Sequence, residues 1–449
     1  MAGTTIKKAG IDPTTSATTG TFSFWVKLNN IRTDGNDYFL FSTYDDANSR
    51  FYIKIDGSAK LQVLNKISSS TTVNLVTNRK FRDTSGWYHI VVAFDTTQAT
   101  SSNRAKVYVN GVQETSFSTE TYPSQNIDLH PLQGNKIHYV GGYGGGTSSS
   151  NYCLDGSMSH IHFADGQQYA ASVFGETDTT TGEWKIKTTP TVTYGNNGWF
   201  ILKDGNSLTN QAGNSAGNFT VENGTLTKCE DNPSNVFATL NRLQGGQAET
   251  MGLMEGGLYL SGNGSSSWRV IGATLADNSG KYYWEGKVIG GVSQMRIGIC
   301  DVTQIPTSAG TKFTVKSRGY GVDTANLVNN NGNVGGFTVT SFTTNDILMF
   351  AMDLDNSKLY IGKNGTWMNS GDPTSGSTGT GAASIASGYY YTPCSEHYDS
   401  SANFAYNFGS GNFRTTAVAS AGTNASNNGV FEYNVPTGYT ALSTKGLNT

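Results

Sequence analysis

Few side chains in this 449-residue sequence are arranged for covalent chemistry. No serine nucleophile is indicated, because the Gly-x-Ser-x-Gly sequence Gly213–Gly217 lies in a predicted Asn/Gly/Ser-rich loop and not at a strand-to-helix elbow. No histidine–cysteine arrangement indicates a thiol nucleophile. The glycine-rich run 141–146 lacks the Lys-Ser/Thr pair and the following helix of a phosphate-binding loop, so we interpret it as a mobile rim loop. His160 and His162 share one side of a predicted strand, but no third metal ligand lies near them in sequence, which favours packing. The sequence therefore predicts no catalytic residues and no enzymatic activity.

Aromatic residues in loop-like contexts are the better candidates for a site, and they would serve binding. Aromatic faces stack on sugar rings, and neighbouring Asn, Asp and Gly groups complete the hydrogen bonding. The alternative is that these rings pack in the core or between subunits. The candidates are Tyr44, Tyr143, Tyr152, Trp268, Trp367, Tyr389, Tyr390 and Tyr391.

The composition is typical of an all-β protein. Charged residues make up 14% of the chain, against roughly 25% in an ordinary soluble protein. The 55 glycines, with many Ser, Thr and Asn residues, favour turns over helices. A net charge of −3 with scattered cations offers no basic surface for nucleic acid. No apolar run approaches the roughly 18 residues of a membrane span.

The chain start and the cysteines indicate where the protein is made. The first eight residues contain no apolar segment of the kind found in secretory signals. Four widely spaced cysteines fit no metal-ligand pattern and allow three pairings, and without an export signal we expect free, mostly buried thiols. They are Cys153, Cys229, Cys300 and Cys394. An extracellular composition without an export signal is typical of virion proteins, which are made in the host cytoplasm and exposed after lysis.

Strict alternation of apolar and polar residues predicts strands at Thr21–Leu28 and 88–94, and Asn110-Gly111 predicts a hairpin turn. The order of the motifs Phe22–Val26, Trp87–Asp95 and Tyr108–Gly111 resembles the LamG, or concanavalin A-like, family over residues 1–168. This resemblance implies a β-sandwich that hosts lectins, hydrolases and adhesion modules alike.

Calcium is the one cofactor that the resemblance suggests, because LamG and legume-lectin relatives often hold it in carboxylate loops. Asp45, Asp46 and Asp155 are the candidate oxygen ligands. An ordinary turn at residues 45–48 is the favoured alternative.

Glycoside hydrolases of the laminarinase type share this fold, and their site is Glu-x-Asp-x-x-Glu on one strand. Here Glu176 and Asp178 are followed by Thr181 where the second catalytic carboxylate belongs, and the next carboxylate is Glu183. The two-carboxylate mechanism then lacks a partner at the required place. We expect no hydrolysis of glycosidic bonds.

We predict that residues 169–257 form an ordered connector, which partly completes the first sandwich through a strand at Gly198–Leu202. The stretch from Phe163-Ala164-Asp165-Gly166 to Ala238-Thr239-Leu240-Asn241 resembles segments of marine bacteriophage proteins of the LamG type. Residues 415–449 are expected to form a C-terminal tail, and its last part, Val430–Thr449, resembles the endings of such proteins.

Residues 258–414 resemble the SPRY family. The apolar strand before Asp353-Leu354-Asp355, the strand that follows it and the Lys363-Asn364-Gly365 turn carry the resemblance, together with the strand at Gly280–Val288. SPRY domains are β-sandwich binding modules, so the resemblance implies recognition and no catalytic residues.

The sequence as a whole predicts two antiparallel β-sandwiches in tandem. The function that it favours is a bacteriophage virion structural protein, either a tail fibre or appendage or a head decoration, exposed on the virion surface. Its partners would be other virion proteins, further copies of itself, and a host-surface glycan or protein, with contacts near Tyr143 and Tyr389–Tyr391. Two alternatives stay open: a cell-envelope glycoside hydrolase and a purely architectural virion protein.

Overall fold

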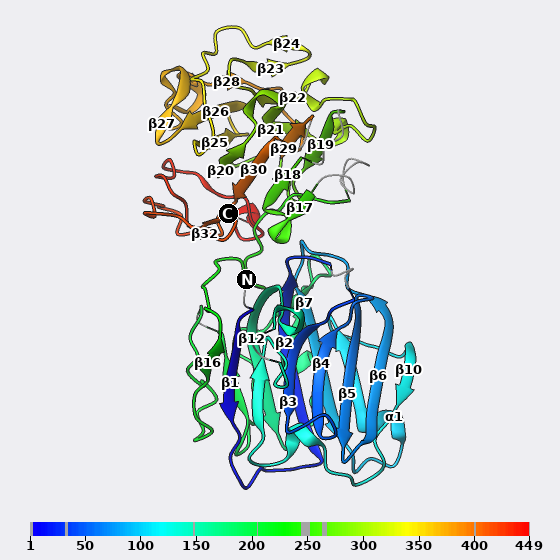
Figure 1. Cartoon of the computed structure of the whole chain (residues 1–449). Coiled ribbons are helices and arrows are strands. Elements are labelled where there is room, and N and C mark those ends of the chain that lie inside the picture. The colour runs from blue at the N-terminus through cyan, green and yellow to red at the C-terminus, as the bar shows by residue number, and fades with distance from the viewer. Residues whose placement is uncertain are drawn as a thin grey trace. The chain divides into compact units, whose positions relative to one another are not determined.

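The computed structural model describes residues 3–31, 35–146, 149–203, 205–243, 252–262, 267–398 and 401–448 (Figure 1). The chain forms two compact units, Met1–Lys228 and Cys229–Thr449. Within the described ranges the only α-helix is α1 (Ser101–Arg104), and nearly all other regular structure is β. The all-β prediction is therefore confirmed, as expected for a chain rich in Gly, Ser, Thr and Asn.

The first unit contains an antiparallel eight-stranded sheet, in which register is set by apolar residues at every second position. A β-bulge between Phe39 and Phe41 turns Phe39 away from the core while Leu40 and Phe41 both face it. In spatial order the strands are β10 (Phe117–Thr121), β6 (Ser70–Lys80), β5 (Lys60–Ile67), β4 (Arg50–Ile55), β3 (Tyr38–Tyr44), β11 (Ile137–Val140), β1 (Thr5–Ala9) and β16 (Thr220–Asn223).

A six-stranded antiparallel sheet packs against the first sheet, and the two enclose one core. Phe22 of this sheet contacts Phe41 of the other with ring centroids 4.5 Å apart. Residues beyond 168 take part, since β15 pairs with β12. The strands are β15 (Trp199–Ile201), β12 (Gly156–Asp165), β2 (Thr19–Leu28), β7 (Tyr88–Asp95), β8 (Ala105–Val109) and β9 (Val112–Gln113), with a separate hairpin of β13 (Gly175–Thr177) and β14 (Trp184–Ile186).

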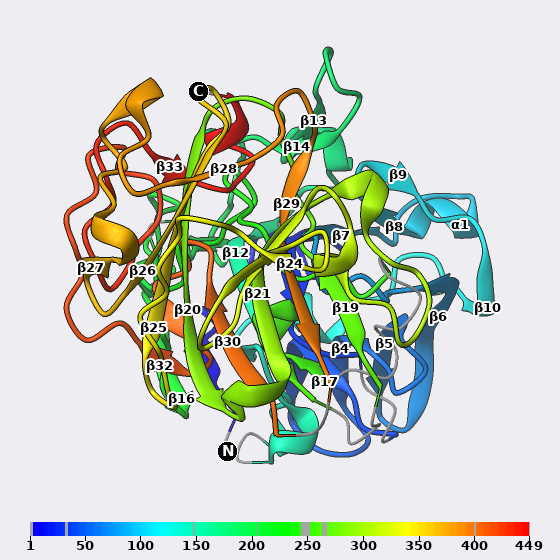
Figure 2. The same ribbon diagram turned by 90° about the horizontal axis from the view of Figure 1, so that it is seen from above.

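The second unit is also a sandwich of two sheets (Figure 2). Trp284 stacks on Phe350 at 5.2 Å in its core. One sheet contains β17 (Gly252–Met254), β18 (Tyr259–Ser261), β30 (Asn403–Asn407), β20 (Lys281–Gly290), β25 (Ile347–Asp353), β26 (Lys358–Lys363), β27 (Thr366–Trp367), β28 (Ala383–Ser384) and β33 (Thr440–Ala441). The other contains β19 (Arg269–Gly272), β29 (Tyr391–His397), β21 (Met295–Asp301), β22 (Gly319–Val322), β23 (Leu327–Asn329) and β24 (Gly332–Asn333), and β31 (Asn412–Phe413) pairs with β32 (Thr416–Ala417).

Single turns of 3₁₀ helix connect many strands, as is common in turn-rich chains. They are η1 (His130–Leu132), η2 (Ser150–Tyr152), η3 (Ala171–Val173), η5 (Glu255–Gly257), η6 (Val292–Gln294), η7 (Val302–Gln304), η8 (Phe313–Val315), η9 (Met368–Ser370), η10 (Gly376–Thr378) and η11 (Gly446–Asn448).

The segments expected to be a connector and a tail belong to the bodies of the units. The boundary between Lys228 and Cys229 falls inside the expected connector 169–257. Ala238 is fully buried in the core of the second unit, where its N–H donates to the Leu442 carbonyl at 2.9 Å. The tail adds β33, which pairs in parallel with β20, and it buries Tyr439.

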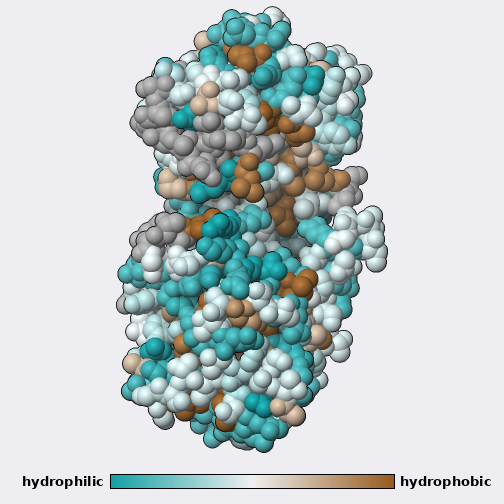
Figure 3. Space-filling model, turned by 90° about the vertical axis from the view of Figure 1, so that its right-hand side faces the viewer, coloured by the Kyte–Doolittle hydropathy of each residue, from teal (hydrophilic) through white to brown (hydrophobic). Residues whose placement is uncertain are grey.

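The face of the molecule drawn in Figure 3 is mainly teal and white, with hydrophobic residues in small groups. In the described part of the chain, no helix is long and apolar enough to cross a membrane.

Candidate binding surface

An aromatic cluster on the first unit is the best candidate for a binding site. Tyr143 stacks on Phe39 at 4.7 Å between ring centroids, and it meets Tyr44 edge-on at 5.2 Å, Tyr152 at 5.8 Å and Tyr52 at 6.3 Å. Phe39 also contacts Tyr52 at 5.3 Å. We call these five residues the Tyr143 cluster. It brings together three residues that the sequence analysis named, Tyr44, Tyr143 and Tyr152.

The strand pattern of the eight-stranded sheet places this cluster outside the core. On β4, Phe51 and Ile53 face the core, so the intervening Tyr52 faces outward. Phe39 joins it from the neighbouring β3 because of the bulge. Exposure increases outward from this base: Phe39 and Tyr52 are buried, Tyr143 is half-buried and Tyr152 is 39% exposed. The result is an aromatic surface with a packed base and accessible upper rings.

The glycine-rich run that precedes η2 fits between these rings. A Cβ atom on Gly144 would lie 2.6 Å from Tyr139 Cε2 and 2.8 Å from Tyr44 Cβ. A Cβ on Gly145 would lie 2.8 Å from Tyr143 Cε1. Any larger residue at either position would push the tyrosines apart, because real Cβ atoms do not approach that closely. The run therefore acts as a tightly packed support for the cluster.

Charged groups border the Tyr143 cluster. Lys54 Nζ lies 5.0 Å from the centre of the Tyr52 ring and 5.5 Å from that of Phe39, and it forms a 2.7 Å ion pair with Asp37. Burial raises the pKa of Tyr52 to about 12. Burial also raises the pKa of Tyr143. Both hydroxyls are thus protonated at neutral pH and can donate hydrogen bonds.

The three calcium candidates have separate protein partners. Asp45 forms an ion pair with Lys136 at 2.5 Å, and its Oδ2 lies 3.1 Å from His130 Nε2. Asp46 accepts backbone N–H groups of its own turn, which is the turn that the sequence analysis favoured. Asp155 accepts the side-chain amides of two asparagines. Within the described ranges, no group of three His, Cys, Asp or Glu side chains is placed to hold a metal ion.

The aromatic candidates of the second unit are dispersed. Lys312 Nζ lies 4.4 Å from the Trp268 ring centre, and Arg318 lies 4.0 Å from that of Tyr389. Trp367 is half-buried and meets the core residue Tyr283 edge-on at 6.4 Å. Tyr390 is 52% exposed.

Tyr391 is 1% exposed, and the structure removes it from the list of candidate binding residues. It begins β29, and its hydroxyl donates to the Ala386 carbonyl at 3.0 Å. Alternation along the strand accounts for the difference from Tyr390, since neighbouring residues face opposite sides.

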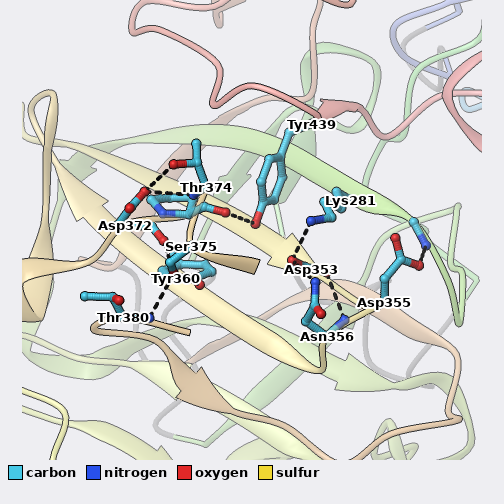
Figure 4. Close-up of polar contacts among 12 residues, drawn as sticks. Lys281, Asp353, Asp355, Asn356, Tyr360, Asp372, Thr374, Ser375, Thr380 and Tyr439 are labelled. Carbon is cyan, nitrogen blue, oxygen red and sulfur yellow. Dashed lines mark hydrogen bonds and ion pairs between the residues drawn. The ribbon is translucent and has the colours of Figure 1, made fainter. Parts of the chain in front are cut away.

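The acidic residues of the SPRY-like signature, Asp353 and Asp355, make structural contacts within the second unit (Figure 4). Asp353 is fully buried, where it forms a 2.9 Å ion pair with Lys281 and accepts the Asn356 backbone N–H at 3.0 Å. Asp355 accepts the Gly280 N–H at 2.7 Å. The acidic residues thus close the turn between β25 and β26 and join it to β20.

A polar cavity of about 670 Å³ opens beside this turn in the second unit. Its walls include Asp277, Lys281, Asp355, Tyr439 and Lys445. Tyr282 donates to Asp277 at 2.5 Å, so part of the wall's hydrogen-bonding capacity is already used. We regard the cavity as a secondary candidate site.

The carboxylates of the hydrolase alternative lie on the β13–β14 hairpin. Glu176 and Glu183 are exposed, and Lys185 lies 3.8 Å from Glu176 and 3.1 Å from Asp178. The Asp178 carboxylate also accepts two backbone N–H groups of its own turn. These contacts are those of a solvated polar turn.

Comparison with solved structures returns partial matches at low sequence identity. The SPRY domain of human HERC1 is 19% identical, with a TM-score of 0.27, over 33% of this chain and 87% of that one. A heptameric SAP-like pentraxin from Limulus polyphemus is 13% identical, with a TM-score of 0.28, over 38% of this chain and 72% of that one. A putative carbohydrate-binding protein from Bacteroides ovatus is 13% identical, with a TM-score of 0.33, over 51% of this chain and 59% of that one. Comparison with curated proteins finds no match.

Residues 4–166 match a family model, Laminin_G_3, described as the concanavalin A-like lectin/glucanases superfamily. The match runs from β1 through β12 and includes every residue of the Tyr143 cluster. This match supports, for residues 4–166, the concanavalin A-like domain that the sequence indicated.

Proposed function

We propose that the first unit binds glycans through the Tyr143 cluster. The observation that carries this proposal is the convergence of five aromatic rings from two strands and a loop on the outer face of a lectin-type sheet. Aromatic rings stack on the apolar faces of sugars, while polar groups at the rim select their hydroxyls. Protonated tyrosine hydroxyls, together with Arg50 and Lys54, supply such donors here.

Replacing Tyr152 by alanine should weaken glycan binding, because this ring is the most exposed of the cluster and supports no core packing. Loss of one stacking ring removes about 1–2 kcal/mol of binding free energy, or roughly 5- to 30-fold in Kd. Tyr143→Ala should cost more, because all four other rings contact Tyr143. The measurement is a glycan-array screen of the full chain, followed by titration calorimetry of the best ligand with each variant.

The matched control is Tyr390→Ala, which removes an exposed tyrosine from the second unit. It should leave the affinity unchanged, and circular dichroism should show all three variants folded. Equal affinity of the wild type and Tyr152→Ala for every array ligand would contradict the proposal. Release of reducing sugar that disappears in Glu176→Gln would instead support the hydrolase alternative.

We further propose that the protein acts on a bacteriophage particle, as a tail fibre, appendage or head decoration. The support is the resemblance of the region from Phe163 to Asn241 to phage proteins, together with a composition suited to the outside of a cell. Many copies on one particle would let weak glycan sites act together, since linked sites raise avidity by about 10²- to 10⁴-fold. The tail packs into the second unit, where it buries Tyr439 and adds β33 to a sheet. It is therefore less available for contacts with other proteins of the particle.

Antibodies raised against the whole chain should label the surface of purified particles in electron micrographs. Particles assembled with Tyr152→Ala should keep the label and adsorb more slowly to cells, because each site is weaker. Antibody against an internal virion protein serves as the negative control. Normal adsorption with intact labelling would favour the purely architectural alternative, and labelling absent from particles would exclude the virion setting.

A further inference from the structure

Lys8 directs its amine into the first unit. On β1 it alternates with the exposed-side residue Lys7, and like Ile6 it faces inward, where it is 4% exposed. Its Nζ donates to the Ala9 carbonyl at 2.9 Å and to Asn197 Oδ1 at 3.3 Å. No carboxylate forms an ion pair with it in the part of the chain that the structure describes. A buried lysine without an ion-pair partner is costly and calls for a physical explanation.

Asn197, which faces this amine, is fully buried directly before β15. Its Oδ1 accepts a second hydrogen bond, from the Ile11 backbone N–H at 3.2 Å. Its Nδ2 is also buried and has no hydrogen-bond partner among the described residues. The side-chain carbonyl of Asn197 thus accepts hydrogen bonds from two donors, the Lys8 amine and the Ile11 N–H, which polarise it. Its NH₂ group makes no hydrogen bond to the described residues.

A buried carboxylate completes the group. Asp165 is fully buried at the end of β12 and accepts the Asn197 backbone N–H at 3.0 Å. It also accepts the backbone N–H groups of Thr15 at 2.7 Å and Ser16 at 3.1 Å, and the Thr14 hydroxyl at 2.9 Å. These bonds fix the carboxylate beside the Lys8–Asn197 pair and explain the Asp of the Phe-Ala-Asp-Gly motif.

We propose that Lys8 and Asn197 join through an intramolecular isopeptide bond. The neutral Lys8 amine attacks Asn197 Cγ, so that a Nζ–Cγ bond forms and the Cγ–Nδ2 bond breaks. The proton lost by Nζ is taken up by Nδ2, which leaves as ammonia. One amide replaces another, so the step needs no oxidant, reductant or activated co-reactant.

Three features of the site favour this step over a simple hydrogen bond. Both reacting groups are held in contact before the reaction, which removes most of the entropic barrier. The Ile11 N–H donates to the oxygen on which negative charge develops during attack. Burial lowers the pKa of Lys8 to about 8, although the negative charge of Asp165 acts to raise it. A substantial fraction of the amine is therefore neutral near pH 8.

The bond would connect the two sheets of the first unit. Lys8 lies in the eight-stranded sheet, and Asn197 directly precedes a strand of the six-stranded sheet, 189 positions further along the chain. A covalent link that closes so long a loop restricts the unfolded state strongly. It would therefore resist unfolding of this unit by heat or by mechanical force.

Mass spectrometry of the purified full chain tests the proposal directly. The intact mass should be lower than the sequence mass by one ammonia molecule. Trypsin does not cleave after a modified lysine, so the digest should contain one branched species in which peptide 8–27 is joined to peptide 188–203. An intact sequence mass, with linear peptides covering both positions, would overturn the proposal. Ammonia loss that maps to a linear Asn197 peptide, as a succinimide, would overturn it too.

The same substitution at adjacent positions provides a matched pair of variants. Lys8→Met should abolish the ammonia loss and the branched species. Lys7→Met should keep the ammonia loss, because Lys7 points outward and pairs with Glu222. It should also give a branched species, in which peptide 1–27 takes the place of 8–27 because the cleavage site at residue 7 is gone. If Lys8→Met does not fold, the peptide map of the wild type still decides the question. A branched species that persists in folded Lys8→Met would show that another amine reacts, against the assignment.

Discussion

Acidification from pH 6.5, where an unfolded histidine is half-protonated, to pH 5 should destabilise the first unit by about 5 kcal/mol, which is comparable to the whole stability of many domains. The cause is three histidines that the fold holds in their neutral form. Burial lowers the pKa of His89 to about 3 and that of His138 to about 3, and it moves the pKa of His162 well below 6.5. The unfolded chain binds all three protons below about pH 6.5.

The hydrogen bonds at these rings make protonation costly in the fold. His138 Nδ1 accepts from the Trp199 indole N–H at 3.0 Å, and His89 Nδ1 accepts from that of Trp184 at 3.0 Å. A proton on either nitrogen would remove the acceptor and leave a buried charge. Between pH 6.5 and 3 the unfolded state therefore binds more protons than the folded state. Each histidine then lowers the free energy of unfolding by about 1.4 kcal/mol per pH unit as the pH falls, or about 4 kcal/mol for three.

Denaturant unfolding between pH 8 and 4.5, with hydrogen exchange of first-unit peptides as the readout, measures this slope. The His89→Gln variant should be less stable than the wild type at pH 7.5. Its stability should also fall less steeply with acidification, by about 1.4 kcal/mol per pH unit, because one titrating group is gone. Tyr390→Ala, in the second unit, should retain the full slope. Stability of the first unit that is constant from pH 6.5 to 5 would contradict the prediction.

Most of the first sandwich could be predicted from the sequence, because its strands alternate strictly and its hairpins contain characteristic turns. The predicted strand at Thr21–Leu28 corresponds to β2, and the Asn110-Gly111 turn joins β8 to β9. The alternation and the turn are both local features of the sequence, so they can be recognised without knowing which strands pair. The polar end of β6 carries no such local signal, and it becomes a strand through pairing with β5, where Lys80 faces Lys60.

The candidate site could be predicted only in part, because it depends on contacts between distant segments. Tyr44 and Tyr143 were recognised as unusual, but nothing local shows that they meet. Phe39 was missed because a β-bulge turns its side chain from the core side of the sheet to the outer side, and the alternation of residue types does not reveal a bulge. Lys8 did carry a signal, since it occupies an inward position two residues after Ile6 in a short strand.

The second unit should respond to pH in the opposite sense, through Glu285 of β20. This carboxylate is fully buried without a cation and accepts the backbone N–H groups of Glu432 and Tyr433, each at 2.8 Å. The Tyr283 hydroxyl donates to it at 2.8 Å, and the Asn407 amide at 3.4 Å. It thereby fastens the C-terminal tail to the central strand of the unit.

Burial raises the pKa of Glu285 from 4.5 to about 7, although the four donors oppose the rise. Because the folded-state pKa exceeds the unfolded one, this group stabilises the fold below pH 4.5, and that stability is lost as the pH rises to about 7. The shift of 7 − 4.5 = 2.5 units corresponds to about 3 kcal/mol. Hydrogen exchange of peptides covering 430–435 should accordingly show weaker protection at pH 8 than at pH 5, after correction for the intrinsic rate.

Glu285→Gln tests this prediction, since the amide resembles the protonated acid and does not titrate. Relative to the wild type, the variant should gain about 3 kcal/mol of stability on going from pH 5 to pH 8. The control is Glu432→Gln, which alters a half-buried carboxylate of the same segment that accepts the Ala419 N–H at 2.6 Å. This control should keep the pH dependence of the wild type. If Glu285→Gln also keeps it, the pH response arises from another group, and Glu285 holds the tail through its hydrogen bonds alone.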